Sequence, residues 1–375
     1  MTVVPPRIVA EIGTAHGGDL KRARSLIEAA REAGADTAKF QLVRSDEILH
    51  PRSGTVHLPG GRIPLYERFR ELERSEEFYT DLKRICRETD IRFLCTPFGI
   101  ESARLLRRME VEEIKIASPE LNHLPLLREV STYQKPLIVS VGVATAGDID
   151  EALAVVRSGA VTLLQCVTAY PAPEEEYNLR TIPAMRDLFG VPVGVSDHSL
   201  DPVVVPSLAT LMGASMIEKH ITLRRADTGL DDPIALEPTD FAMMVAEVRE
   251  IAARLAEAGE KDPIEYHRAR LTIEERVKSR YGSTRVEKIL GTGVKGLTPS
   301  EQRNYGYTNR SVHALTSLSA GLILTKKNTA ILRSEKNLSP GLHPRYWDSI
   351  LGATLTRGIA AGEGVTWDHL LVRDQ

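Results

Sequence analysis

Residues 7–19 read RIVAEIGTAHGGD, a short apolar run followed by a loop of small residues. A run of this kind, with little polar alternation, is typical of a parallel strand that is covered on both faces. An open, doubly wound sheet usually carries a Gly-x-Gly-x-x-Gly turn directly after its first strand. The loop GTAHGGD lacks that spacing, which favours a closed barrel over the open sheet.

Seven more short apolar runs follow, and amphipathic segments separate them. In the first of these segments Asp19 can cap a helix on which Leu20, Ala23 and Ile27 share one face. Eight strand–helix units in about 250 residues are typical of an α/β protein with a (β/α)8 TIM barrel. The strands are predicted at 7–12, 36–41, 91–98, 112–118, 135–142, 160–167, 191–198 and 214–221.

Composition divides the chain into three parts. Residues 1–258 carry the strand–helix rhythm and form the predicted catalytic barrel, and residues 259–305 are strongly charged and predict an exposed helical and loop linker. Residues 306–375 return to short apolar runs punctuated by Gly, Pro and Asn, which predicts a small, mostly β module. A module of this size is weakly stable alone, so we expect it to dock on another surface.

The bulk composition excludes several classes of protein. A net charge of −3 gives no reason to expect a nucleic-acid or membrane-surface partner. No apolar run approaches the roughly 18 residues of a membrane span, and the N-terminus lacks the pattern of a signal peptide. The cysteines Cys86, Cys95 and Cys166 are few, odd in number and set in or beside apolar runs. They predict reduced core thiols and a cytoplasmic location.

Every predicted strand ends in polar or ionisable side chains. The active site of a TIM barrel lies at the carboxyl ends of its strands. These side chains are therefore expected to face one cavity. In chain order they are Glu11 with His16 on the following loop, Lys39, Gln41, Thr96, Lys115, Ser118, Glu120, Ser140, Thr168, Tyr170, Ser196, Asp197, His198, Glu218, Lys219 and His220.

Lys39 and Lys115 lie inside otherwise apolar strands. A buried ammonium is costly unless it meets an anion. Two such lysines, ringed by serine and threonine hydroxyls, predict a receptor for phosphate and carboxylate groups. The alternative is that each lysine pairs with a neighbouring acid.

His198 and His220 end neighbouring strands, whose axes lie about 5 Å apart. Both imidazoles could therefore reach one divalent metal ion and leave positions open for substrate and water. A pair of hydrogen-bonded core histidines is the alternative. Glu218 lies two residues before His220 and points to the same strand face, where it can serve as an acid or base.

At these residues the sequence resembles a known family. The motifs GADTAKFQ, CTPF, IKIASPELNHLPLL, AYPAPEEEYNL, VGVSDHSL and GASMIEKHITL occur in one order. They are similar to those of the sialic acid synthase family, whose members condense phosphoenolpyruvate with an N-acyl hexose to make nonulosonic acids. The C-terminal segment beginning NRSVHALTSLSAGLILT resembles that family's antifreeze-like SAF domain.

The resemblance implies a role for each matching residue. Lys39, Thr96, Lys115, Ser118, Ser140 and Ser196 match phosphoenolpyruvate ligands, and Thr168 stands beside them. His198 and His220 match ligands of manganese, for which magnesium, cobalt or iron are alternatives. Arg310 matches an arginine that the SAF domain of one subunit inserts into the active site of the other, which implies a domain-swapped homodimer. Glu11, Gln41, Tyr170, Glu218 and Asp231 match positions that meet the sugar or assist the chemistry, with Glu11, Glu218 and Lys115 as the catalytic candidates.

The chain departs from the family pattern at four places. Ala15 and Thr168 each replace an asparagine, which is expected to alter the pocket wall. The segment 266–286 looks inserted, and the RPG turn of the SAF domain reads RSEKNLSPG. We therefore expect the reaction type to be kept and the sugar acceptor to be open. His16 either touches the substrate or only anchors its loop.

Three other functions remain open at this point. A Schiff-base aldolase would use Lys115 or Lys219 and no metal. A non-catalytic barrel would bind sugar phosphates, with the C-terminal module as a regulatory unit. A related condensing enzyme would make octulosonic or heptulosonic acids from another acceptor, but such enzymes usually lack the SAF domain.

Overall fold

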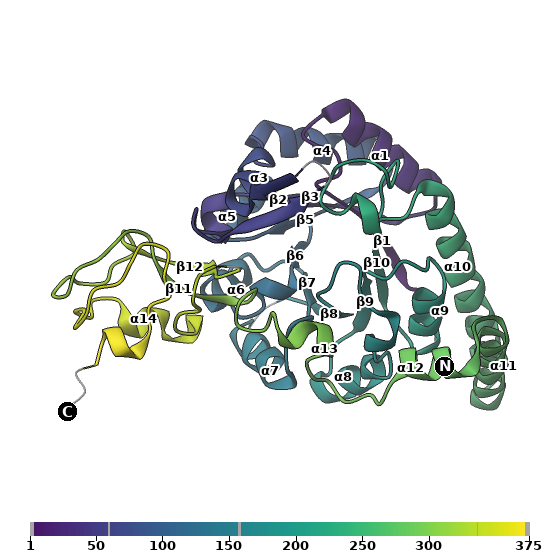
Figure 1. Cartoon of the computed structure of the whole chain (residues 1–375). Helices are drawn as coiled ribbons and strands as arrows, with labels where there is room; N and C mark the ends of the chain where they lie inside the picture. Colours follow the sequence, from purple (N-terminus) through teal and green to yellow (C-terminus); the bar gives the residue numbers. More distant parts are fainter. Residues whose placement is uncertain (1–3, 59–60, 157–158, 336, 372–375) are drawn as a thin grey trace.

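The computed structural model describes residues 4–58, 61–156, 159–335 and 337–371. Eight parallel strands form one sheet in the order β5-β2-β1-β10-β9-β8-β7-β6. The strands at its two ends, β5 and β6, pack against each other, so the sheet nearly closes on itself (Figure 1). The predicted TIM barrel is confirmed. The strands are β1 (Arg7–Gly13), β2 (Thr37–Leu42), β5 (Arg92–Pro97), β6 (Ile114–Ile116), β7 (Leu137–Ser140), β8 (Val161–Cys166), β9 (Val193–Asp197) and β10 (Met216–His220).

Helices surround the barrel on its outside (Figure 1). The first begins at the predicted cap, where the Asp19 carboxylate accepts hydrogen bonds from the Lys21 and Arg22 backbone N–H groups. None of the described helices is long and apolar enough to cross a membrane. The outer helices are α1 (Leu20–Glu32), α4 (Glu76–Glu88), α5 (Ile100–Arg108), α6 (Leu124–Ser131), α7 (Ala146–Val155), α8 (Thr181–Phe189), α9 (Val204–Leu211) and α10 (Pro238–Lys261).

The barrel interior is layered along the strands. One layer is an apolar cluster of Val9, Leu94, Ile138, Leu164 and Met216. Because alternate residues of a strand share a face, the residues two positions further on form the next layer toward the carboxyl ends. That layer is polar and consists of Glu11, Thr96, Ser140, Cys166 and Glu218. The apolar layer seals the barrel beneath the polar one, so the predicted site residues share a single cavity.

An excursion between β2 and α4 was not among the predicted elements. It contains α2 (Ser45–Ile48), the antiparallel hairpin of β3 (Thr55–Leu58) and β4 (Gly61–Pro64), and α3 (Leu65–Glu71). Its buried side chains Val43, Ile48 and Tyr66 form a small core of their own with Phe98. The excursion follows a strand end, so it lies at the mouth of the barrel.

The charged segment after the barrel is more tightly packed than expected. It forms α11 (Pro263–Tyr281), α12 (Ser283–Leu290) and the short α13 (Pro299–Gln302). Ile273, Val277, Val286 and Ile289 are buried in the main core of the barrel. Apolar side chains at helical spacing on α11 and α12 thus attach part of this segment to the barrel, while the domain boundaries at 258 and 305 stay predictions.

The C-terminal module has a small core of its own around Val312, Leu324, Trp347 and Val365. Its elements are β11 (Arg310–Ala314), which pairs antiparallel with β12 (Thr329–Arg333), and α14 (Trp347–Ile350). The short 3-10 helices among the described residues are η1 (Ser118–Glu120), η2 (Glu174–Glu176), η3 (Asp232–Ile234), η4 (Pro344–Tyr346) and η5 (Trp367–His369). The module docks on the barrel beside α2, where the backbone of Arg333 forms an isolated parallel β-bridge with that of Leu49.

Candidate active site

A cavity of about 350 Å³ opens at the carboxyl ends of the strands. Residues from the barrel, the excursion after β2 and the C-terminal segment line it. The structure brings the following predicted residues together around this cavity: Glu11, Lys39, Gln41, Thr96, Lys115, Ser118, Ser140, Thr168, Tyr170, Ser196, His198, Glu218, His220 and Asp231.

Lys39 lies between two buried carboxylates. Its Nζ is 2.7 Å from Glu218 Oε1 and 3.3 Å from Glu11 Oε2. Burial by itself lowers the pKa of this ammonium, but the two carboxylates outweigh it and raise the pKa. Gln41 completes the group by donating from Nε2 to Glu11 Oε1 over 2.7 Å. Lys39 therefore follows the second of the two predictions for the lysines, pairing with neighbouring acids.

Lys115 is held differently. Its Nζ donates to Ser140 Oγ over 2.6 Å and to the Ile116 carbonyl over 3.1 Å, and it lies 3.8 Å from Glu218 Oε1. Burial lowers its pKa to about 8. A bound anion would reverse this shift, because a negative charge beside a buried ammonium favours the protonated form. The surroundings of Lys115 thus suit a phosphate or carboxylate ligand.

Two hydroxyls in the cavity lack partners among the described residues. Thr96 Oγ1 and Thr168 Oγ1 are buried and form no hydrogen bond. Ser118 Oγ accepts from the Gly142 N–H over 3.0 Å, and Ser196 Oγ donates to Glu218 Oε1 over 2.9 Å. Buried polar groups in native proteins usually have partners. The free hydroxyls of Thr96 and Thr168 are therefore donors available to a ligand.

Two buried glutamates of the cavity have pKa values shifted in opposite directions. Burial raises the pKa of Glu11 to about 7, against the effect of Lys39. Burial acts in the same direction on Glu218, but Lys115 and Lys39 outweigh it and lower its pKa to about 2. Glu218 is thus a permanent carboxylate, whereas Glu11 can gain and lose a proton near neutral pH. Two titratable groups whose pKa values are shifted apart in this way are the usual candidates for the acid and base of a reaction.

The predicted metal ligands His198 and His220 have ring centroids 5.6 Å apart. His198 Nδ1 lies 2.9 Å from the Val167 carbonyl, and a hydrogen bond there leaves Nε2, 3.5 Å from Ser196 Oγ, as the ring nitrogen that can bind a ligand. Tyr170 stacks on His198 at 4.3 Å, and Asp231 Oδ2 is 3.9 Å from His220 Nδ1. Burial holds the pKa of His220 well below its usual range, so the ring is a neutral donor.

Imidazole nitrogens are ligands that suit first-row divalent metal ions. Burial lowers the pKa of His198, but Cys166 beside it outweighs burial and raises the pKa, so His198 would bind a metal ion with loss of a proton. The described residues contain no group of three or more His, Cys, Asp or Glu side chains that could hold a metal ion. The residues present therefore fit a metal ion only if water and substrate complete its coordination. This is the open arrangement expected of a catalytic metal site rather than a structural one.

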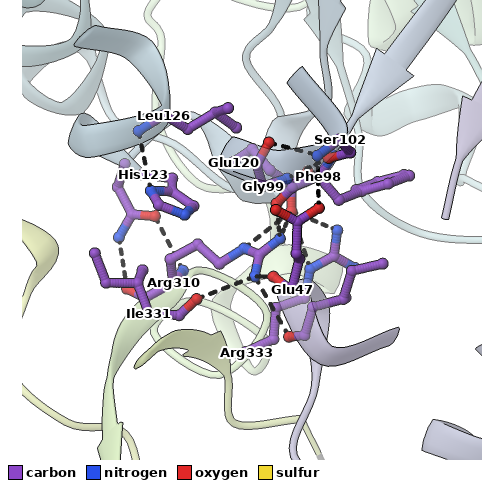
Figure 2. Close-up of polar contacts among 12 residues, drawn as sticks. Glu47, Phe98, Gly99, Ser102, Glu120, His123, Leu126, Arg310, Ile331 and Arg333 are labelled. Atoms are coloured by element: carbon purple, nitrogen blue, oxygen red, sulfur yellow. Dashed lines mark hydrogen bonds and ion pairs between the residues drawn. The ribbon is translucent and has the colours of Figure 1, made fainter. Parts of the chain in front are cut away.

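Arg310 does not line the cavity of its own chain. Its predicted role as a substrate ligand in the active site of a partner subunit stays a prediction. Its side chain is fully buried, and its Nη2 donates to Glu120 Oε1 over 2.9 Å and to the Phe98 carbonyl over 2.6 Å (Figure 2). Nη1 donates to the Glu47 carbonyl over 2.5 Å. The physical reason for this position is the buried carboxylate of Glu120, which follows β6 and needs a cation.

Arg333 lies next to Arg310 and does reach the cavity. Its Nη2 donates to Glu120 Oε1 over 2.6 Å, and its guanidinium lies 5.6 Å from the centre of the Phe98 ring (Figure 2). Glu335 lines the cavity beside it, with a carboxylate oxygen 3.9 Å from Arg333 Nη1. One carboxylate, that of Glu120, therefore holds two arginines of the C-terminal module.

Several cavity residues were not predicted. Asn304, Thr308, Arg333 and Glu335 come from the C-terminal segment, and Thr55, Leu65 and Phe69 come from the excursion after β2. The altered turn RSEKNLSPG was a signal for Arg333 and Glu335, since it departs from the family pattern. The period-two alternation of β8 was a signal for Cys166, which lies two residues before Thr168. Nothing in the local sequence marked the others.

His16 and Ala15 lie beside the cavity rather than in it. The His16 ring packs against Phe78 at 5.0 Å, and its Nδ1 accepts from the Gly18 N–H over 2.9 Å. Burial lowers its pKa to about 4. The Ala15 carbonyl accepts from Arg22 Nε over 2.6 Å. Of the two roles predicted for His16, the structure favours the anchor of the loop, and Ala15 does not form the pocket wall.

Comparison with known proteins gives a consistent result. The NeuB family matches residues 26–260, and the SAF domain matches residues 309–371. The spore coat polysaccharide biosynthesis protein SpsE of Bacillus subtilis is 34% identical, over 99% of this chain and 95% of that protein. Its crystal structure superposes with a TM-score of 0.80 at 32% identity, covering 99% of this chain and 96% of that one.

Two relatives carry names that state a reaction. The N,N'-diacetyllegionaminic acid synthase of Legionella pneumophila is 28% identical, over 97% of this chain and 94% of that enzyme. The pseudaminic acid synthase of Helicobacter pylori is 29% identical, over 98% of both chains.

Proposed function

Because the chain belongs to the NeuB family, we propose that it condenses phosphoenolpyruvate with an N-acyl hexose. The products are a nonulosonic acid and phosphate. One observation supports this proposal above all. A single cavity contains Lys115, two unpartnered hydroxyls, a pair of glutamates with divergent pKa values, and two imidazoles with ring centroids 5.6 Å apart.

The anionic substrate would bind at the Lys115 side of the cavity. Lys115, with Ser140 already bonded to it, and the free hydroxyls of Thr96 and Thr168 can surround a phosphate or carboxylate. Carbon 3 of phosphoenolpyruvate then attacks the aldehyde carbon of the open-chain sugar. Water adds to carbon 2, and phosphate leaves by cleavage of its C–O bond. Lys115 stabilises the charge of the departing phosphate.

The two glutamates of the cavity would have different roles, one in charge stabilisation and the other in proton transfer. The ionised Glu218 lies 2.7 Å from Lys39 and stabilises positive charge that develops at carbon 2. Glu11, whose pKa of about 7 lets it exchange a proton, serves as the acid or base toward the sugar. Gln41 holds the Glu11 carboxylate in place. Tyr170 and Asp231 line the cavity on the sugar side.

The proposed cofactor is a divalent metal ion on His198 and His220, manganese first, with magnesium, cobalt or iron as alternatives. When bound there, such an ion would act as a Lewis acid toward the aldehyde oxygen. The neutral state of His220 supports this assignment, since metal ligation requires a deprotonated ring nitrogen.

The acceptor is proposed as an N-acetylmannosamine-like N-acyl hexose. The names of the relatives extend the candidates to the acetamido sugars that lead to legionaminic and pseudaminic acids. A different acceptor in the same condensation is the alternative. The Schiff-base reading is not favoured, because Lys219 is paired with Asp197 over 2.6 Å and family membership points to phosphoenolpyruvate chemistry.

We further propose a homodimer that works in the cytoplasm. The C-terminal module docks through Glu120 and Arg310, and a swapped dimer would form the same contacts between subunits. Light scattering of the purified protein tests the dimer, since a monomer at micromolar concentration would contradict it.

The decisive experiment measures phosphate release from phosphoenolpyruvate with a panel of N-acyl hexoses, with and without a chelator. We expect release with at least one sugar, its loss on chelation, and its recovery when manganese is restored. No metal-dependent release with any sugar in the panel would contradict the proposal. Trapping of substrate on the protein by borohydride would favour the aldolase.

A further inference from the structure

Val143 has a strained backbone in the loop that follows β7. Its φ is 49°, in the left-handed region, although its side chain is branched at Cβ. A branched residue rarely adopts this conformation, and such strain persists only where the surroundings hold it. Val143 is fully buried. The residues that hold it therefore determine the shape of this loop.

Both peptide groups of Val143 are held from outside the barrel. Its N–H donates to Glu301 Oε1 over 2.6 Å, and its carbonyl accepts from Asn309 Nδ2 over 3.1 Å. Glu301 lies on α13 and Asn309 directly precedes β11, so both belong to the segment that leads into the C-terminal module.

Glu301 holds a second loop with the same oxygen atom. Its Oε1 also accepts from the Thr168 N–H over 2.9 Å, after β8, while Oε2 accepts from Thr298. The carboxylate is fully buried and forms no ion pair with a described residue, although its charge acts on the buried ammonium of Lys295. Burial of a charge is costly without compensating hydrogen bonds. The N–H groups of the two loops therefore stabilise the buried carboxylate, and the carboxylate in turn holds the two loops in place.

The loop of Val143 packs directly against the hydroxyls of the cavity. The N–H of the preceding Gly142 donates to Ser118 Oγ over 3.0 Å. A Cβ at Gly142 would lie 2.4 Å from Thr168 Oγ1 and 3.0 Å from Ser118 Oγ. A change of backbone at Val143 would therefore displace Ser118 and Thr168.

We propose that Glu301 is a positioning residue, which holds Val143 in its left-handed conformation and thereby places Ser118 and Thr168 to bind the anionic substrate. This inference rests on the proposed function, because it takes phosphoenolpyruvate as the ligand on that side. It also gives the connecting segment a role in substrate binding, although neither Glu301 nor Asn309 lines the cavity.

The test compares four variants by the KM for phosphoenolpyruvate. Glu301→Ala removes the acceptor, so we expect KM to rise roughly 10- to 100-fold, as small misplacements of binding groups do. Glycine adopts a left-handed backbone without strain, so Val143→Gly alone should stay close to wild type. When Val143→Gly is added to Glu301→Ala, the KM for phosphoenolpyruvate should return much of the way to the wild-type value. Ser300→Ala is the control, because it loses the hydroxyl contacts of the same segment to Glu176 and Thr298 but neither bond from Glu301 to the two loops.

Hydrogen exchange provides a readout that does not need substrate. Exchange of the peptide that covers residues 141–145 should accelerate in Glu301→Ala, because the Val143 N–H loses its acceptor. If Glu301→Ala does not fold, Asn309→Ala replaces it, because this variant removes the donor to the Val143 carbonyl. The KM defect of Asn309→Ala should likewise be relieved when Val143→Gly is added.

An unchanged KM in Glu301→Ala, or a defect that Val143→Gly does not relieve, would overturn the positioning role. A wild-type protein that does not bind phosphoenolpyruvate would instead contradict the proposed function. In that case accelerated exchange at 141–145 in Glu301→Ala would still support the conclusion that Glu301 holds the backbone of Val143. Unchanged exchange would refute that conclusion.

Discussion

The Nζ atom of Lys39 lies 2.7 Å from Glu218 Oε1, with both side chains buried at the mouth of the barrel. This contact joins β2 to β10 across the strand β1, whose Glu11 is the second partner of the lysine. Each member depends on the others, because removal of one partner leaves a buried charge without compensation. Lys115 and Lys39 together outweigh burial and keep Glu218 ionised, whereas at Glu11 burial outweighs Lys39 and raises the pKa to about 7.

Replacement of Lys39 by Met should reduce kcat/KM for phosphoenolpyruvate by roughly 10²- to 10⁴-fold, the effect of losing a preorganised electrostatic group. The reason is that two carboxylates would then share one site, and at least one would become protonated. Phosphate-release kinetics measure the loss, and circular dichroism checks the fold. Lys288→Met, on the exposed surface of α12, is the matched control. A change of less than about twofold in Lys39→Met would refute the role of this contact.

His220→Ala should abolish phosphate release while the protein stays folded. One imidazole would remain in the cavity, and a single donor holds a divalent ion too weakly for catalysis. Metal content after dialysis, measured by mass spectrometry, should fall with activity. His267→Ala, an exposed histidine on α11, should change neither. Turnover retained in His220→Ala would remove the metal assignment.

Glu120→Ala should destabilise the protein by about 3–5 kcal/mol, because it leaves Arg310 and Arg333 buried without their carboxylate. Urea unfolding followed by tryptophan fluorescence measures this, since Trp347 lies in the core of the docked module. Arg345→Ala is the comparison, as it breaks an ion pair with Glu151 that also joins module and barrel but is partly exposed.

For that exposed pair we expect a loss of at most about 1 kcal/mol. Equal effects of the two variants would mean that burial of the Glu120 cluster does not govern docking of the module.

His313 should make the protein less stable in mild acid. Burial lowers its pKa to about 4 from an ordinary value of 6.5, and the ring is bonded to the Gly362 carbonyl over 2.8 Å. Between these two pH values the unfolded chain binds more protons than the folded one, so stability falls as the pH falls. The full effect of this group is on the order of 3 kcal/mol.

Unfolding free energies from pH 7 to pH 4, compared between wild type and His313→Gln, measure this contribution. The variant should have the flatter profile, because glutamine cannot titrate. Parallel profiles would show that other groups carry the acid sensitivity. His16 and His123, whose pKa values are also lowered by burial, are the candidates for such groups.

Much of the barrel could be predicted from the sequence because its pattern is local. Each of the eight strands is a short apolar run, and each predicted run overlaps a strand of the structure. Parallel strands carry their carboxyl ends to the same side, so the polar residues there converge whatever the details of packing. The grouping of Lys39, Lys115, Ser140, His198 and Glu218 around one cavity followed from that rule.

Contacts between distant segments decided the rest. The opposite pKa shifts of Glu11 and Glu218 depend on distances to lysines on other strands, which no local pattern encodes. Arg310 pairs with Glu120, 190 residues earlier. The strained Val143 is held by Glu301, 158 residues later. Strand order and the residues at the barrel mouth were determined by the sequence alone, since periodicity and strand direction suffice. Charge state, docking and strain were decided only by the tertiary structure, because they arise where burial brings far segments together.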